Sequence, residues 1–344
     1  MSLFKSKTSV ALLAILLVSL IVPMFVVNKF YMHIIILMLF YAAISGSWNI
    51  LAGYAGQLSL GHAIFFGIAG YTSTLLFIKL GISPWIGMMV AIVLCMLVGA
   101  FIGYPTFRLK GPFFTLATLA FSEVIRLLVS HFKGLTNGAV GLNIPFHPGW
   151  GTMMFRAKEP YYFIALAILL LVLGLTYWID RSKLGSYLIA IREDEDAAEA
   201  LGIPITRYKM FAVLISSGLA AISGVFYAQY ILFIEPEAVF NVNFSVQVAL
   251  ITIIGGMGTV FGPLVGSIIM IPLNEVLRSA FSSLNGLNFF IYGIILILVV
   301  TVIPNGILPT VRNWIIRWKT DGNQRALANR LNPRKGGDRI DSAS

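Results

Sequence analysis

The chain has 344 residues and a formal net charge of +10; 58% of its residues are apolar or aromatic and only 11% are charged. Soluble domains carry about 45–50% apolar and about 25% charged residues, so this composition excludes a soluble globular protein. The single cysteine, Cys95, excludes a disulfide framework and a cysteine-based zinc site, and we expect it to be a structural thiol.

Long apolar segments dominate the chain from end to end. A bilayer core about 30 Å thick requires about 20 mostly apolar residues per helix, because backbone groups in lipid must be satisfied within the segment. Such segments lie at 8–27, 31–52, 56–78, 84–105, 113–131, 161–179, 209–232, 244–256, 259–281 and 288–308. The sequence therefore predicts an all-α fold, a polytopic integral membrane helical bundle of about ten spans.

Two of these segments are unusual. Lys5 and Lys7 precede the first one, as in a signal peptide, but no small-residue cleavage site follows, so we expect an uncleaved helix. The eighth is short for a full span and runs into Gly255, Gly256 and Gly258. This pattern predicts a half-helix that ends in a tight turn.

Lysine and arginine residues indicate the topology. With alternating loops and the N-terminus inside, 17 of the 24 basic residues fall on the inner side, which is the side that basic loops prefer. We therefore expect both termini inside, a transmembrane domain over 1–311 and a disordered basic cytoplasmic tail over 312–344 against anionic headgroups. Because the basic residues are scattered between apolar segments, we expect no nucleic-acid partner.

The most polar stretch lies between the sixth and seventh segments. Five of the 14 acidic residues fall within 193–199, and Gly202 and Pro204 follow as helix-ending residues. The pattern predicts one short amphipathic cytoplasmic helix over about 185–202, with acids near its start. The alternative is a solvated helix without a partner that lies on the bilayer surface, but anionic lipid repels acidic side chains. A protein partner is therefore favoured.

Three separated motifs carry a family resemblance. They are GQLSLGHAIFFGIAGY at 56–71, Arg192 with DAAEALG at 196–202, and GGMGTVFGPLVG at 255–266. Together they resemble the permease subunits of branched-chain amino acid ABC importers, of the M type. The resemblance implies a bacterial inner-membrane (plasma-membrane) permease subunit that works with a sister permease subunit, two ABC ATPase subunits and a periplasmic substrate-binding protein, in contact with the lipid bilayer.

The resemblance also assigns a role to the acidic segment. In that family the cytoplasmic helix is the coupling helix that fits a groove of the ATPase. Here the role is carried over to Arg192, Glu193, Asp194, Glu195, Asp196, Glu199 and Gly202. Branched-chain amino acids are the expected substrates, with urea, amides or other small solutes as the alternative.

The sequence contains neither a nucleotide-binding motif nor a catalytic zinc motif. It contains no Gly-Lys dipeptide and hence no P-loop, and no His-Glu-x-x-His zinc motif. We therefore expect no enzyme activity, no metal and no bound cofactor in this chain, with ATP and Mg in the partner subunits. An ion-coupled secondary transporter is the weaker rival, since it needs titratable carboxylates within the membrane.

Two Glu–Arg pairs at membrane depth are the main charged candidates. Glu123 and Arg126, and Glu275 and Arg278, are each three residues apart and share a helix face. We hypothesise that they form part of the outer gate or the docking surface for the binding protein; the alternative is a structural brace. Each Arg would hold its Glu ionised, which disfavours the ion-coupled rival.

Polar and small residues near the inner side complete the pathway or gate candidates. Gln57, Ser59 and His62 open the third segment, where they can hydrogen-bond across helices or line a water-filled path. For His62 we favour an interhelical hydrogen bond over substrate contact. Gly256 and Gly258 are expected at the tight turn, near the cytoplasmic gate.

Overall fold

The computed structural model describes residues 28–109 and 111–281, together with residues 23, 26, 290–291, 293–294, 297–298, 301, 306–311 and 314. The predicted first span at 8–27 and the tail at 312–344 lie almost entirely outside the described residues, and so does about half of the tenth span at 288–308.

Long helices make up most of the described chain. They are α2 (Lys29–Asn49), α3 (His62–Leu80), α4 (Pro84–Thr106), α5 (Pro112–His131), α7 (Glu159–Arg181), α10 (Ile205–Ile231), α12 (Val242–Gly256) and α13 (Gly262–Ala280). The short helices are the π-helical turn η1 (Ile50–Tyr54), α6 (Lys133–Thr136), the 3-10 turn η2 (Gly138–Val140), α8 (Lys183–Glu193), α9 (Glu195–Ala200) and α11 (Pro236–Val239). Strand β1 (Leu142–Asn143) pairs antiparallel with β2 (Phe233–Ile234), and Leu142 lies opposite Ile234.

Seven of the described helical segments are long and apolar enough to cross a membrane. They are Lys29–Tyr54, His62–Leu80, Pro84–Thr106, Pro112–His131, Glu159–Arg181, Ile205–Ile231 and Pro236–Gly256. The predicted ninth span is helix α13, which falls outside this set because Asn274, Glu275 and Arg278 make its second half polar. The protein is thus an all-α, multi-pass membrane protein, and the count of ten spans stays a prediction.

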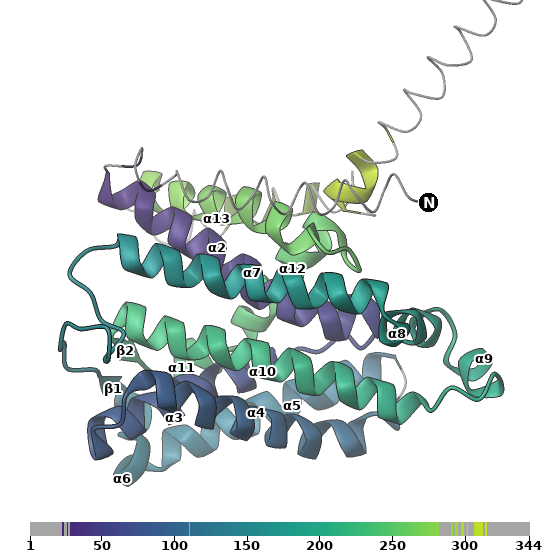
Figure 1. The fold of residues 1–344 in the computed structure, drawn as a ribbon, viewed down its shortest axis with the longest axis horizontal. Helices are drawn as coiled ribbons and strands as arrows, with labels where there is room; N and C mark the ends of the chain where they lie inside the picture. Colours follow the sequence, from purple (N-terminus) through teal and green to yellow (C-terminus); the bar gives the residue numbers. More distant parts are fainter. Residues whose placement is uncertain are drawn as a thin grey trace, which may run out of the picture.

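The helices lie side by side along the long axis of the molecule (Figure 1). Helix α10 is central and packs against α2, α3 and α4, while α2 also packs against α7 and α13. The β1–β2 pair and α6 lie at one end of the bundle, and α8 and α9 lie at the opposite end. Segments that are far apart in sequence therefore meet at each end.

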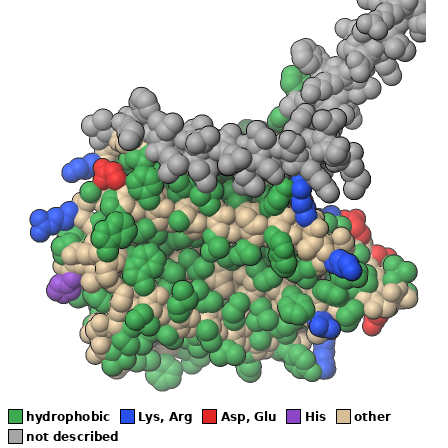
Figure 2. Space-filling model, viewed as in Figure 1, with side chains coloured by type: hydrophobic (Ala, Val, Ile, Leu, Met, Phe, Trp, Pro, Cys, Tyr) green, Lys and Arg blue, Asp and Glu red, His purple; other side chains and the backbone are tan. Residues whose placement is uncertain are grey.

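The surface has an apolar middle and charged ends. Figure 2 shows hydrophobic side chains over the central band, with Lys, Arg, Asp and Glu gathered toward the two ends. On α4 the outward residues Met89, Leu97 and Phe101 are all exposed. Exposed side chains of this size over a wide band suit a lipid-facing surface.

The third span begins later than the sequence pattern predicts. Helix α3 starts at His62 and not at residue 56, because Gly56 has a φ of +70° and turns the chain after η1. The Gln57 N–H donates to the Leu51 carbonyl (3.1 Å), which fixes this turn. Gln57 and Ser59 therefore precede the helix and do not lie on it.

The predicted eighth segment, 244–256, corresponds to α12. This helix has 15 residues and ends at Gly256, as the glycine pattern predicts. The short helix α11 precedes it, and the combined segment Pro236–Gly256 reaches 21 residues. The half-helix is therefore extended on its N-terminal side.

Candidate functional site

The acidic segment folds as two helices, which corrects the predicted single helix over 185–202. Helix α8 ends at Glu193, and Asp194 is extended at φ −159° with its side chain accepting from the Ala197 N–H (3.0 Å). Asp194 therefore breaks one helix and caps the next, a role for which Asp is well suited. The acids gather at the N-terminus of α9, where the helix dipole stabilises negative charge. We call residues 182–202 the acidic arm.

The acidic arm projects from one end of the bundle (Figure 1). Glu193, Asp194, Asp196 and Glu199 are all exposed, and Figure 2 shows acidic side chains gathered at that end. Gly202, at φ +80°, ends the arm as predicted. An open groove of about 520 Å³ runs beside it, lined by Tyr104 of α4, Glu199 and Arg207 among others. The arm thus offers carboxylates next to a recessed surface.

One acidic side chain of the arm points inward. Glu195 Oε1 lies 2.6 Å from Lys209 Nζ on α10, and it accepts a second hydrogen bond from Gln57 Nε2 at 3.2 Å. The Lys209 side chain is 0% exposed, whereas the Glu195 side chain is 22% exposed. A buried ammonium needs a partner charge, so Glu195 ties the arm to α10 and to the segment before α3.

Arg192 makes a second connection from the arm to the bundle. Its Nη1 donates to the Gly53 carbonyl in η1 at 2.7 Å, while Nη2 pairs with Glu193 at 2.6 Å. A Cβ placed on Gly56 would lie 2.9 Å from Arg192 Cγ, so the chain after η1 passes directly under this side chain. Single π-helical turns often occur at functional sites.

The glycine turn after α12 closes the same junction. Gly256 and Gly258 have φ values of +127° and +74°, and they form the predicted tight turn. Asn49 at the end of α2 spans this turn, because its Oδ1 accepts from the Gly258 N–H (2.8 Å) and its Nδ2 donates to the Thr259 carbonyl (2.9 Å). A Cβ on Gly258 would lie 2.7 Å from Arg192 Nη1. The arm, η1 and the turn therefore meet around one guanidinium; we call this meeting point the arm junction.

Close helix packing accounts for the remaining glycines of the third motif. A Cβ on Gly255 would lie 1.8 Å from the Gly262 carbonyl oxygen, and one on Gly266 would lie 1.9 Å from the Ile251 carbonyl oxygen. Helices α12 and α13 thus touch backbone to backbone, as small residues permit in membrane proteins.

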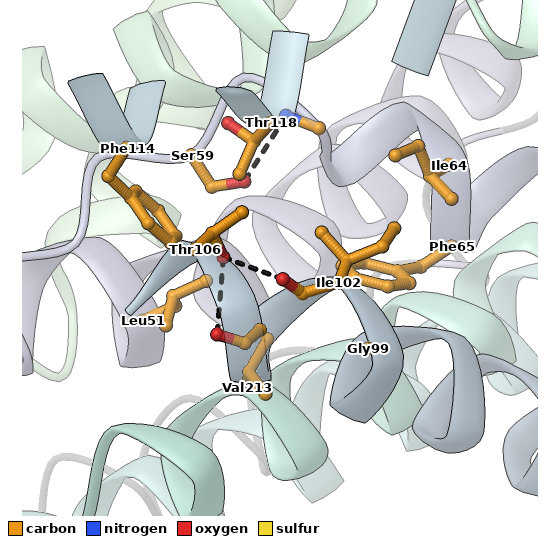
Figure 3. A pocket seen from close by; sticks show the side chains of 12 residues that line it. Leu51, Ser59, Ile64, Phe65, Gly99, Ile102, Thr106, Phe114, Thr118 and Val213 are labelled. Carbon is orange, nitrogen blue, oxygen red and sulfur yellow. Dashed lines mark hydrogen bonds between the residues drawn. The ribbon is translucent and has the colours of Figure 1, made fainter. Parts of the chain in front are cut away.

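His62 and Ser59 are buried in this structure. His62 Nε2 is 2.8 Å from Ser216 Oγ on α10, which in turn donates to the Ser47 carbonyl at 2.6 Å. This is the interhelical hydrogen bond that the sequence favours for His62. Ser59 and Thr118 border a small, partly open cavity of about 10 Å³ (Figure 3), enough for about one water molecule. Thr106, on the opposite side of the cavity, donates to the Ile102 carbonyl.

The two Glu–Arg pairs differ, although the sequence treats them alike. Arg126 Nε donates to Glu123 at 3.0 Å, and the same guanidinium also bonds Glu237 on α11. Arg278 Nη2 lies 3.6 Å from Glu275, beyond hydrogen-bond length. The Arg126 side chain is 18% exposed and that of Arg278 is 67% exposed. Arg126 thus joins two helices, whereas Arg278 has no hydrogen bond to any residue that the structure describes.

Comparison with known proteins identifies the chain's relatives. The family described as branched-chain amino acid transport system / permease component matches residues 9–300. The chain belongs to this permease family. It is 28% identical over 329 residues to the high-affinity branched-chain amino acid transport system permease protein LivM of Salmonella typhimurium, which covers 89% of this chain and 76% of that protein. LivM of Escherichia coli matches to the same extent. No solved structure matches the chain at a significant level.

A second kind of permease is also similar. LivH of Escherichia coli is 27% identical over 283 residues, which covers 78% of this chain and 91% of LivH. The permease family consists of transport components and not of enzymes, in line with the expectation from the sequence. Among the described residues, no group of three or more His, Cys, Asp or Glu side chains is placed to hold a metal ion.

Several residues that connect the acidic arm to the bundle of this permease could not be identified from the sequence. In the sequence Lys209 is only one of the basic residues that indicate the topology, and Asn49 and Gly53 belong to none of the three motifs. Their partners lie far along the chain, as with Asn49 and Gly258. The one usable signal is a lysine inside an apolar segment, since such a charge requires a partner.

Proposed function

We propose that this chain is the membrane-spanning permease subunit of an ABC importer for branched-chain amino acids, and that the acidic arm couples it to an ATPase subunit. The observation that carries the proposal is the arm junction. Exposed carboxylates face outward on the arm, while Arg192 and Glu195 on the same arm hold η1 and α10. A partner that moves the arm therefore acts directly on the bundle.

The arm junction gives that movement a route to the solute pathway. Arg192 holds the Gly53 carbonyl, and Asn49, four residues earlier on the same helix, holds the glycine turn. The turn joins α12 to α13, so a shift of the arm alters the position of both helices. In this proposal the ATPase contacts the arm differently in its ATP-bound and ATP-free conformations. ATP binding and arm position are therefore thermodynamically linked, and this difference in contacts drives the movement of the arm.

The proposal implies several partners and a location. The chain pairs with a sister permease, and similarity to both LivM and LivH supports a family in which two permeases coexist. Two ATPase subunits bind ATP and Mg, and a periplasmic binding protein delivers the substrate. The membrane is the bacterial inner membrane, with the acidic arm and both chain termini on the cytoplasmic side.

Affinity purification of the tagged chain in mild detergent, followed by mass spectrometry, tests the coupling role. The test variant carries Glu193→Lys, Asp196→Lys and Glu199→Lys, all at exposed arm positions. The matched control is Glu159→Lys, at an exposed position at the opposite end of the bundle. We expect an ATPase to copurify with the wild-type chain and the control but not with the arm variant. Equal recovery from all three would contradict the coupling role.

Uptake measurements in cells test the substrate. We expect ATP-dependent accumulation of labelled leucine, isoleucine and valine, and none of labelled urea. Uptake of urea or an amide alone would assign the chain to the alternative solute class. Leucine uptake that persists after ATP depletion and stops when the ion gradients are dissipated would favour an ion-coupled carrier.

A further inference from the structure

The groove beside the acidic arm has a lining of mixed chemistry. It has a volume of about 520 Å³, which is typical of small-molecule sites, and it lies where α4, the end of the arm and the start of α10 meet. Its apolar walls include Ile203 and Met210. Its polar lining consists of Tyr104, Glu199, Thr206 and Arg207. We call this space the arm groove; it brings one cation, one carboxylate and apolar surface together.

Both charged side chains of the arm groove are available to a ligand. Arg207 forms no hydrogen bond or ion pair with any residue that the structure describes, and its Cζ lies 5.8 Å from the centroid of the Phe211 ring. The Glu199 carboxylate also has no partner in the described part of the chain, whereas Glu195 on the same helix pairs with Lys209. The groove thus offers an unpaired group of each sign.

The arm groove lies at the level of the lipid headgroups on the arm side of the membrane. Tyr104 follows Pro84, at the start of α4, by twenty residues, a rise of about 30 Å at 1.5 Å per residue. That rise matches the thickness of the hydrocarbon core, about 30 Å. Trp85 and Tyr104, near the two ends of α4, are both exposed, and exposed aromatic residues mark the two membrane interfaces. Lipid phosphates therefore lie level with the groove.

The arm groove also opens onto the lipid-facing surface of α4. Leu97, Phe101 and Tyr104 are separated by four and three residues, so they share one face of the helix. All three side chains are exposed. This apolar strip runs along α4 up to the wall of the groove. An acyl chain can follow the strip while its headgroup occupies the groove.

We propose that the arm groove binds the headgroup of a phosphatidylethanolamine molecule. The phosphate accepts hydrogen bonds from the Arg207 guanidinium and the Thr206 hydroxyl, because guanidinium groups match phosphates in geometry and charge. The ammonium group donates to Glu199, and an acyl chain lies along Phe101. An anionic headgroup without the ammonium would place a like charge beside Glu199. The inference goes beyond the proposed transport function, since it assigns a lipid to the space between the arm and α4.

Native mass spectrometry of the full complex, purified in detergent and titrated with one phospholipid at a time, tests the proposal. Phosphatidylcholine is the matched lipid, since it has the same net charge but its methylated ammonium has no N–H to donate. We expect the wild-type complex to bind phosphatidylethanolamine about tenfold more tightly, the factor that one charge-assisted hydrogen bond contributes. Glu199→Gln should remove this preference. Equal affinity of the wild-type complex for the two lipids would overturn the proposal.

A second pair of variants tests the phosphate contact. Arg207→Gln should weaken binding of both lipids about tenfold, because both carry the same phosphate, and Arg207→Lys should restore part of the affinity. The matched control is Arg181→Gln, because Arg181 is also exposed and lies over a ring, that of Tyr177 at 4.3 Å, but does not line the groove. It should leave both affinities unchanged. Unchanged lipid binding in Arg207→Gln, or an equal loss in Arg181→Gln, would overturn the site.

The same preparations distinguish a lipid from a protein in the arm groove. Retention of the ATPase by Arg207→Gln, together with weakened phosphatidylethanolamine binding, supports the lipid. Loss of the ATPase from Arg207→Gln with unchanged lipid affinity would assign the groove to the ATPase and overturn the proposal. A wild-type chain that copurifies with no ATPase contradicts the proposed function instead, and its lipid affinities still test the groove.

Discussion

Lys209 and Glu195 form an ion pair across the boundary between the bundle and the acidic arm. The ammonium is completely buried at the start of α10, and its carboxylate partner comes from a helix whose other acids are exposed. The arm is therefore not a detached surface element. Any partner that lifts it must uncover or re-pair a buried charge, which makes arm movement costly unless partner binding offsets the cost.

The first prediction concerns this pair. Glu195→Gln leaves the buried Lys209 ammonium without its charge partner and should lower the free energy of unfolding by about 3 kcal/mol, the range found for broken buried pairs. Glu199→Gln, an exposed position on the same helix, should change it by less than about 0.5 kcal/mol. Thermal unfolding of the purified complex measures both. The double variant Glu195→Gln with Lys209→Met should recover much of the loss; a double variant no better than Glu195→Gln would argue against the pair.

The second prediction concerns transmission through Arg192. Arg192→Ala removes the hydrogen bond to the Gly53 carbonyl but keeps the exposed acids of α9, so the ATPase should still bind. Transport should fall about tenfold, the value of one charge-assisted hydrogen bond, while ATP hydrolysis continues. Hydrolysis and leucine uptake measured together in proteoliposomes give the ratio. If both activities fall in parallel, Arg192 serves assembly and not transmission.

The third prediction concerns the glycine turn. Gly258→Ala places a Cβ at φ +74° and 2.7 Å from Arg192 Nη1, so it should destabilise the chain by about 1–3 kcal/mol and reduce uptake. Gly174→Ala in α7 is the matched control, since nothing lies within 4 Å of its added Cβ. Helix propensity predicts that this control stabilises by about 0.5–1 kcal/mol. Thermal unfolding with an uptake assay distinguishes the two; equal tolerance at both positions would exclude a constrained turn.

The fourth prediction separates the two Glu–Arg pairs. Arg126 joins α5 to α11, so Arg126→Gln should reduce the yield of assembled complex. Among the described residues Arg278 has one loose contact, so Arg278→Gln should leave assembly unchanged; as a residue of the hypothesised outer gate, it should lower leucine uptake about tenfold. Size-exclusion chromatography and uptake on the same preparations measure both effects. If Arg278→Gln reduced assembly and Arg126→Gln reduced only uptake, Arg278 on α13 would be the structural brace and Arg126 on α5 the residue that acts in transport.

Much of this architecture can be predicted from the sequence, because apolar length alone identifies a membrane helix. The apolar segments predict the positions of α4 and α7, and the glycine pattern predicts the turn after α12. The His62 hydrogen bond follows from the rule that polar side chains in membrane helices hydrogen-bond across helices. The break at Asp194 was missed because Ala-rich surroundings favour one continuous helix, and only the capping bond to Ala197 shows the interruption.

The arm junction could not be predicted, because it depends on which distant segments meet. Gln57 is a pathway candidate in sequence terms, yet its amide bonds Glu195, 138 residues away. Gly53 contributes only a backbone carbonyl, which every residue has. The difference between Arg126 and Arg278 is equally tertiary, since Glu237 reaches Arg126 from another helix.

Because α12 and α13 contact each other backbone to backbone, we expect these two helices to move together as one rigid unit. Gly255 and Gly266 leave no side chains at the contact that could slide past one another. Helix α13 has 19 residues and is about 28 Å long at 1.5 Å per residue. A tilt of about 5° at the glycine turn would therefore carry the far end, where Arg278 lies, through about 2 Å. That distance is enough to make or break a hydrogen bond on the opposite side of the membrane.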